Sequence, residues 1–148
     1  MLFTFAQQGL FRARFTNQII DEWTRSLIKN KPGLKASIEH QEKIIRNVFE
    51  ECFVTGFEPL IDGLKLPDID DRHVLAAAIK CSAQIIVTEN RKNFPEDMLE
   101  GHGIEALSAD DMLANTFDLF PMGAPRPCAL CVRGMTIPPS QRPNFCWT

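Results

Sequence analysis

The sequence lacks the features that define several large protein classes. None of its apolar runs approaches the roughly 20 residues needed to span a bilayer, so a membrane-spanning helix is not expected. The formal net charge is −3, so no overall positive charge exists and any contact with nucleic acid must be local. The first residues contain neither the basic segment nor the small-residue cleavage site of a signal peptide. We therefore expect a cytoplasmic protein.

The five cysteines do not form a disulfide framework, because their number is odd. Cys52 and Cys81 lie in apolar contexts and are expected to pack as small buried residues. Cys128 and Cys131 form a CxxC, and Cys146 follows, but the sequence offers neither a second CxxC pair nor a later histidine. A structural zinc site is the less favoured interpretation, and three reduced thiols are expected.

Helical and strand patterns alternate along the first 120 of the 148 residues. Helices are expected at about 2–11, 16–30, 34–51, 70–81 and 109–117, and strands at 52–56, 84–88 and 104–107. Thr16 is a candidate N-cap, and Ser108 with Asp111 forms a capping box. Such alternation predicts one α/β domain of three layers around a parallel sheet.

The composition changes after about residue 119. Residues 121–148 contain six of the ten prolines and no apolar period. We therefore expect a domain at 1–120 and an irregular Pro/Cys-rich tail at 121–148.

Three carboxylates crowd the start of the Ala-rich helix: Asp68, Asp70 and Asp71. In one interpretation Asp70 caps the helix and the others favour its positive N-terminal dipole. In the other, the crowded charges are neutralised by a hard cation, Mg²⁺ or Mn²⁺, which prefers oxygen ligands. His73, about one turn into this helix, is expected to pack or to meet solvent rather than to contact phosphate.

Glu22 is a second acid of interest, on the helix whose apolar stripe is formed by Ile19, Ile20, Trp23 and Leu27. At about 100° per residue, Glu22 lies about 100° from the centre of the stripe and Asp21 about 150°. Glu22 can therefore border the buried face and reach a cleft, whereas Asp21 points to water. A solvated Glu22 is the alternative.

Polar residues surround the carboxyl end of the strand at 84–88: Thr88, Glu89, Asn90 and Asn93. Open parallel sheets bind their ligands at this edge, although the two asparagines could serve only as turn residues. Arg72, Arg91 and Lys92 flank the acids. They provide the local positive charge that a phosphodiester needs beside an acidic site.

Residues 68–79, Asp-Ile-Asp-Asp-Arg-His-Val-Leu-Ala-Ala-Ala-Ile, resemble the PIN-domain ribonucleases, in particular the VapC-like toxins. The strand ending in Ile-Val-Thr and the following Asn-Arg-Lys-Asn-Phe-Pro fit the same family, as do residues 9–16 and 19–23. The resemblance covers roughly residues 2–120. It implies a PIN-like three-layer sandwich with a parallel central sheet.

The resemblance also implies a metal-dependent ribonuclease that uses Mg²⁺ or Mn²⁺ to hydrolyse RNA phosphodiesters. By motif position, Glu22 is the acid of the early helix and Asp71 the acid that opens the Ala-rich helix. Asp68 or Asp70 assists, and Asn90 matches the asparagine of a Thr-Xaa-Asn turn. Glu22, Asp71 and Asp68 are therefore expected as metal ligands.

Two departures from the family pattern bear on activity. Asn93 stands where the family has an acid; its amide keeps an oxygen ligand for the metal but removes a charge. The family's first strand, with the Asp that is its first ligand, would precede the residues that open this sequence, so we expect an N-terminally incomplete PIN-like domain.

Three functional interpretations follow. The first is a ribonuclease toxin of a toxin–antitoxin system, with an RNA substrate, a protein antitoxin and a homodimer as expected partners. The second is a catalytically impaired PIN remnant that binds an antitoxin or a partner toxin, with exposed apolar residues such as Phe3 and Phe5 favouring a partner. A different Mg²⁺-dependent phosphotransfer enzyme is less favoured, because the chain offers no Asp at the end of a first strand.

Overall fold

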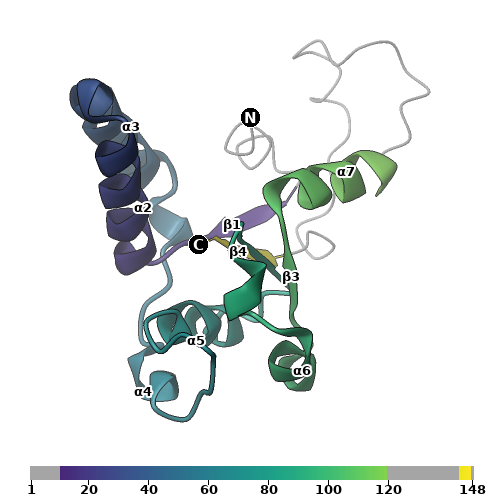
Figure 1. The fold of residues 1–148 in the computed structure, drawn as a ribbon. Coiled ribbons are helices and arrows are strands. Elements are labelled where there is room, and N and C mark those ends of the chain that lie inside the picture. The colour runs from purple at the N-terminus through teal and green to yellow at the C-terminus, as the bar shows by residue number, and fades with distance from the viewer. Residues whose placement is uncertain (1–10, 120–143, 148) are drawn as a thin grey trace.

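The computed structural model describes residues 11–119 and 144–147. The helices are α2 (Asn17–Asn30), α3 (Lys35–Val48), α4 (Glu58–Ile61), α5 (Arg72–Lys80), α6 (Glu96–Leu99) and α7 (Ala109–Leu119). The strands are β1 (Arg12–Arg14), β2 (Ile85–Val87), β3 (Glu105–Leu107) and β4 (Asn144–Trp147). These strands form one parallel sheet in the order β1-β4-β2-β3 (Figure 1).

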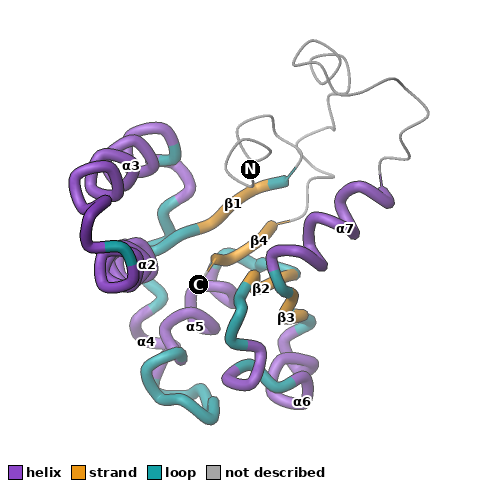
Figure 2. Tube along the Cα trace, turned by 45° about the horizontal axis from the view of Figure 1, so that its top comes forward, coloured by secondary structure: helices purple, strands orange, loops and turns teal. Residues whose placement is uncertain are grey.

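Helices cover both faces of this sheet, as the sequence predicted. Ile86 and Val87 are neighbours on β2, and their side chains enter different apolar clusters because successive strand residues face opposite sides. The cluster around Ile86 contains the buried face of α5, and the cluster around Val87 contains Met112 of α7. Figure 2 shows α5 and α7 on opposite sides of the strands. The three-layer α/β architecture is therefore confirmed.

Helix α2 begins where its sequence predicted. The Thr16 side chain accepts a hydrogen bond of 3.1 Å from the Ile19 amide, which satisfies one of the free amides of the first turn. A 3₁₀ turn at Pro32–Leu34 then separates α2 from α3. Arg46 of α3 reaches across to Asp21 of α2 at 2.6 Å, so the two helices are linked on their exposed side.

Helix α5 is the most deeply buried helix of the described chain. Ala76, Ala77 and Ala78 are 0% exposed, and the short side chains allow the helix to lie close to the sheet. The expectation that Asp70 caps this helix is wrong. Asp71 occupies the N-cap position instead, and its side chain makes no capping hydrogen bond.

Two local predictions in the first half of the chain need correction. Strand β1 was not predicted, and of the helix expected at 2–11 only residue 11 lies within the described residues. The strand expected at 52–56 is reduced to a bridge between Phe53 and Phe15, because Glu50–Cys52 forms a 3₁₀ turn and Gly56 adopts a left-handed φ of 72°.

The expectation of an irregular tail is wrong for residues 144–147. They form β4, which lies between β1 and β2 and pairs Phe145 with Ala13 on one side and Ile85 on the other. The segment Asn-Phe-Cys-Trp contains no proline and has two aromatic residues, which favour strands. Its position gives β1 and β2 backbone partners that neither finds in the other. The CxxC at Cys128 and Cys131 lies outside the described residues.

The two cysteines among residues 11–119 agree with a further expectation. Cys52 and Cys81 are half-buried against the apolar clusters, and burial raises the pKa of both thiols above its ordinary value. Among residues 11–119 and 144–147, no helix has the length and apolar character required to cross a bilayer.

The close packing of α5 gives a test of the fold. Replacing Ala77 by leucine adds three carbon atoms where the side chain is 0% exposed, and should lower the free energy of unfolding by about 1–3 kcal/mol. Ala36→Leu, on the exposed surface of α3, is the matched control and should change it little. Denaturant unfolding measures both. Equal stability of the two variants would contradict the packing described for α5.

Candidate active site

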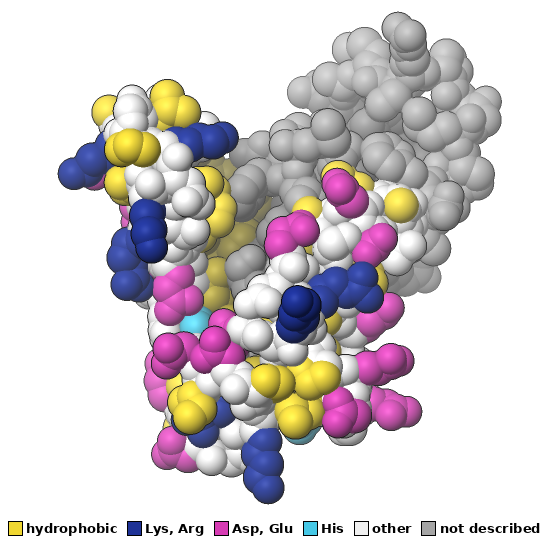
Figure 3. Space-filling view, viewed as in Figure 1, with side chains coloured by type: hydrophobic (Ala, Val, Ile, Leu, Met, Phe, Trp, Pro, Cys, Tyr) yellow, Lys and Arg dark blue, Asp and Glu magenta, His cyan; other side chains and the backbone are white. Residues whose placement is uncertain are grey.

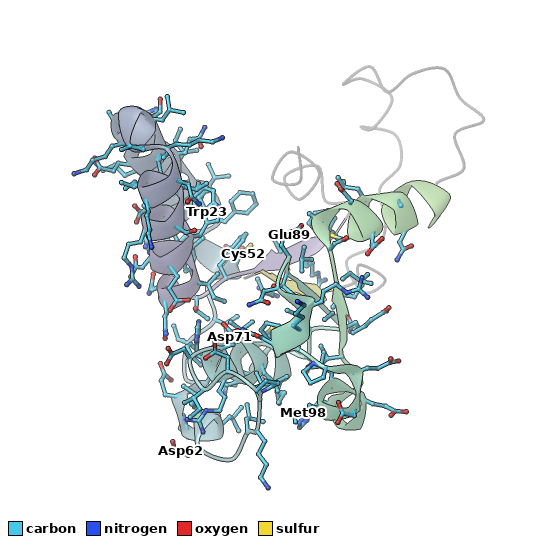
Figure 4. The ribbon with its side chains drawn as sticks, in the orientation of Figure 1. Trp23, Cys52, Asp62, Asp71, Glu89 and Met98 are labelled. Carbon is cyan, nitrogen blue, oxygen red and sulfur yellow. The ribbon has the colours of Figure 1, made fainter. Side chains whose placement is uncertain are left out.

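A cleft of about 270 Å³ opens at the carboxyl end of β2, where parallel sheets bind their ligands. It lies between α2, the start of α5 and the segment after β2. Figure 4 shows Trp23, Asp71 and Glu89 reaching it from these three elements. The cleft is lined by Ile19, Glu22, Trp23, Asp71, Val74, Thr88, Glu89, Asn90 and Phe94.

Glu22 takes the place that helical geometry predicted. It is half-buried and lines the cleft, whereas Asp21 is exposed and pairs with Arg46. Gln18, one turn earlier, donates a hydrogen bond of 3.0 Å to the Glu22 carboxylate. Glu22 is therefore held at the border of the buried face by its own helix.

Asn93 lies among the carboxylates at the start of α5. Its Nδ2 donates to Asp71 at 2.6 Å and to Asp68 at 3.3 Å, so one amide bridges two negative charges. The other Asp68 oxygen accepts from the Asp70 amide at 3.0 Å. Asp71 lines the cleft, whereas Asp68 and Asp70 are exposed outside it, and Asn93 links Asp68 to Asp71. The Asn93 amide reduces the repulsion between the two carboxylates.

The turn after β2 supplies the third wall. Thr88 is buried and its hydroxyl accepts a hydrogen bond of 3.0 Å from the Asn90 amide, which holds Asn90 at the cleft. Glu89 lines the same cleft and accepts from the Ala109 amide at 3.2 Å. From the sequence, Glu89 was expected at the end of the strand but was given no role in the site. Its position directly after a buried parallel strand was the available signal.

His73 lies beneath Glu22 on the first turn of α5, and its side chain is only 4% exposed. Its Nδ1 is 2.6 Å from the Asp70 carbonyl oxygen. Its Nε2 is buried, lies 3.5 Å from the Glu22 carboxylate, and makes no hydrogen bond. His73 is packed, as expected, and it also links the start of α5 to α2.

The side chains of the cleft offer as few protein ligands as a Mg²⁺ site can have. Among residues 11–119 and 144–147, no three His, Cys, Asp or Glu side chains are close enough together to hold a metal ion. Mg²⁺, however, is usually held by one or two carboxylates and completes its shell with water. Glu22 and Asp71 face one cleft and meet that requirement.

Positive charge lies beside the acids rather than among them. Figure 3 shows acidic side chains gathered where α2 meets the start of α5, with basic side chains next to them over the sheet. Arg91 lies 3.3 Å from Asp111 of α7, and Lys92 is exposed. Arg72 donates at 3.2 Å to the Ile69 carbonyl. None of these three basic side chains lines the cleft; Arg91 and Lys92 line a separate cavity, together with Gln84, Ile85 and Phe94.

Comparison with known proteins decides the family. The PIN-domain family profile matches residues 1–92, more than half of the chain. The chain belongs to the PIN-domain family. This PIN-domain chain is also 42% identical over 74 residues to a protein of Mycobacterium tuberculosis named "Putative ribonuclease VapC50". The predicted PIN-domain family is confirmed, and the similarity to this relative supports the predicted VapC-like branch.

The match to this relative is partial in both directions. It covers 50% of this chain and 43% of the relative, so the chain spans less than half of the relative's length. No solved structure shows a significant match to the chain.

The bridging amide of Asn93 gives a test of the site. In Asn93→Asp, a third carboxylate replaces the donor between Asp68 and Asp71, and the free energy of unfolding should fall by about 1–3 kcal/mol without divalent ions. Millimolar Mn²⁺ should raise the melting temperature of this variant more than that of the unaltered chain, because a cation replaces the lost donor.

Asn115→Asp, on the exposed surface of α7, is the matched control for added charge. Its melting temperature should equal that of the unaltered chain, both with and without Mn²⁺. If Asn93→Asp behaves in the same way as this control, Asn93 does not neutralise the acids as described.

Proposed function

We propose that this PIN-domain chain is a metal-dependent endoribonuclease, the toxin component of a toxin–antitoxin system. The observation that carries the proposal is the meeting of Glu22 and Asp71, from helices far apart in the sequence, in one cleft at the carboxyl edge of a parallel sheet. The similarity to a protein named as a ribonuclease of the VapC type supports the same activity.

In this proposal Glu22 and Asp71 hold a divalent ion, Mg²⁺ or Mn²⁺, with Asp68 and Asn93 in support. When bound, such an ion activates water and stabilises the charge that develops on the phosphate. The chain's own groups do the rest. Arg91 and Lys92 attract the RNA backbone, and Asn90 orients the phosphodiester in the cleft.

The proposed partners are an RNA substrate, a protein antitoxin and a second toxin chain, all in the cytoplasm. Helix α3 offers a surface for one of the protein partners, because Ile44 and Val48, one turn apart, are 44% and 50% exposed. Phe3 and Phe5, which the sequence also assigned to a partner, lie outside the described residues.

A second candidate function is that of an impaired PIN remnant that acts by binding an antitoxin or a partner toxin. Asn93 favours it, because an amide stands where the family has an acid and already occupies one oxygen of Asp71. The two candidates differ in one property. The enzyme binds a divalent ion and cleaves RNA, whereas the remnant binds its protein partner without cleaving.

Cleavage of a mixed RNA pool by the purified chain in Mn²⁺ is the direct test. Asp71→Asn should lower the cleavage rate by about 100-fold or more, because it removes a negative charge that would hold the divalent ion on which the proposed reaction depends. Asp62→Asn, at an exposed position after α4, is the matched control and should retain activity.

Equal cleavage by Asp71→Asn and the unaltered chain would overturn the assignment of Asp71. Absence of cleavage by a chain that circular dichroism shows to be folded would favour the second candidate.

A further inference from the structure

Trp23 is the largest side chain that lines the cleft, and the proposed reaction gives it no role. It follows Glu22 on α2 and is half-buried, whereas Ile19 and Ile20 of the same helix are 3% and 2% exposed. Trp23 packs against the apolar cluster around Val87, and it also lines a cleft whose other walls carry carboxylates and an amide. Packing in the core therefore accounts for only part of this side chain.

The cleft has two parts, and Trp23 belongs to the part away from the proposed ion. The acids proposed to hold the ion lie toward α5, because Asp71 directly precedes that helix and Glu22 lies 3.5 Å from its His73. Glu89 lies toward α7, because it accepts a hydrogen bond of 3.2 Å from the first amide of α7. Figure 4 shows Trp23 and Glu89 on opposite sides of the cleft and Asp71 below them.

Charge determines how a nucleotide would lie in these two parts. Glu22, Asp71 and Glu89 repel a phosphate wherever no cation neutralises them. The ion of the proposed function lies with Glu22 and Asp71, so the phosphate belongs there. The part between Trp23 and Glu89 has no proposed cation and therefore suits the neutral part of the nucleotide, which is the base. An aromatic side chain stacks on a base of any kind, because every base has a π-face.

The size of the cleft and the surface of the indole fit one base. The cleft volume of about 270 Å³ lies just below the range of about 300–1,000 Å³ for sites that hold drug-sized ligands. It therefore suits a single nucleotide rather than a folded segment of RNA. Without a ligand, the part of Trp23 that lines the cleft leaves apolar surface in contact with water. A stacked base covers that surface, which is favourable.

We propose that Trp23 binds the substrate by stacking on the base of the nucleotide whose phosphate lies at the ion. The base must then leave the stack of its own strand before cleavage, so the cleft selects nucleotides whose bases are free to do so. The inference rests on the RNA cleft of the proposed function, and its test does not require RNA cleavage.

Adenosine 5′-monophosphate and ribose 5-phosphate are matched probes, because they differ only in the base and neither contains a phosphodiester. In Mg²⁺, adenosine 5′-monophosphate should quench the tryptophan fluorescence of the full chain, whereas ribose 5-phosphate should not. The chain has two tryptophans, which identify the source of the signal. The quenching should disappear in Trp23→Phe and persist in Trp147→Phe.

Calorimetric titration of two variants separates stacking from a merely structural role. Trp23→Leu keeps an apolar side chain against the core but offers no aromatic face. It should weaken the binding of adenosine 5′-monophosphate about 5-fold or more and leave that of ribose 5-phosphate unchanged. Trp23→Phe keeps an aromatic face and should restore most of the affinity. A structural role predicts instead that both probes lose affinity equally.

The outcomes are distinct. Quenching of Trp23 that depends on the base supports the proposal even if the chain cleaves no RNA, in which case only the nuclease function fails. Equal affinity of Trp23→Leu and the unaltered chain for adenosine 5′-monophosphate overturns the stacking and leaves the proposed phosphate site intact. Absence of binding of either probe to the folded chain overturns both the stacking and that phosphate site.

Discussion

Helix α5 lies against the sheet with Ala76, Ala77 and Ala78 completely buried, and the position of the acids at its start relative to the other site residues depends on that contact. Because the helix sits so close to the strands, its first turn is brought to their carboxyl ends. Asp71 then faces the turn that follows β2, and His73 faces α2. Larger residues on the buried face would separate the two layers and move the acids away from Glu22 and Asn90.

The start of α5 also illustrates how the chain manages crowded negative charge. Three aspartates within four residues would repel one another if each carboxylate were left in the same environment. The structure places the three carboxylates in different environments. Asp70 is exposed and accepts no hydrogen bond from Asn93, while Asp68 and Asp71 both accept hydrogen bonds from the Asn93 amide. The Asp71 carboxylate is thereby kept off the helix amides and available to the cleft. The family acid replaced by Asn93 would have made this arrangement dependent on a cation.

Much of the fold could be predicted because its signals are local. The Thr16 cap, the apolar run of α5 and the strand before Thr88 depend on neighbouring residues. Strand β1 also has a signal in the sequence, because Phe11, Ala13 and Phe15 are buried in alternation with two arginines. This pattern was not used to predict a strand because it is short and highly charged. The site was predictable to the extent that helical geometry and strand ends place Glu22, Asp71 and Asn90. The orientation of Asn93 and the partners of His73 come from segments far apart in the chain, which no local pattern reveals.

Strand β4 has a consequence for how the protein is made. It separates β1 from β2 and pairs Ala13 of β1 with Phe145, far along the chain. Parallel pairing over such a sequence distance closes a very long loop and is slow to form. On the ribosome this sheet cannot be completed until residue 147 has been synthesised and has left the exit tunnel. During that interval β1 and β2 expose unpaired edges, which are surfaces that bind chaperones or promote aggregation.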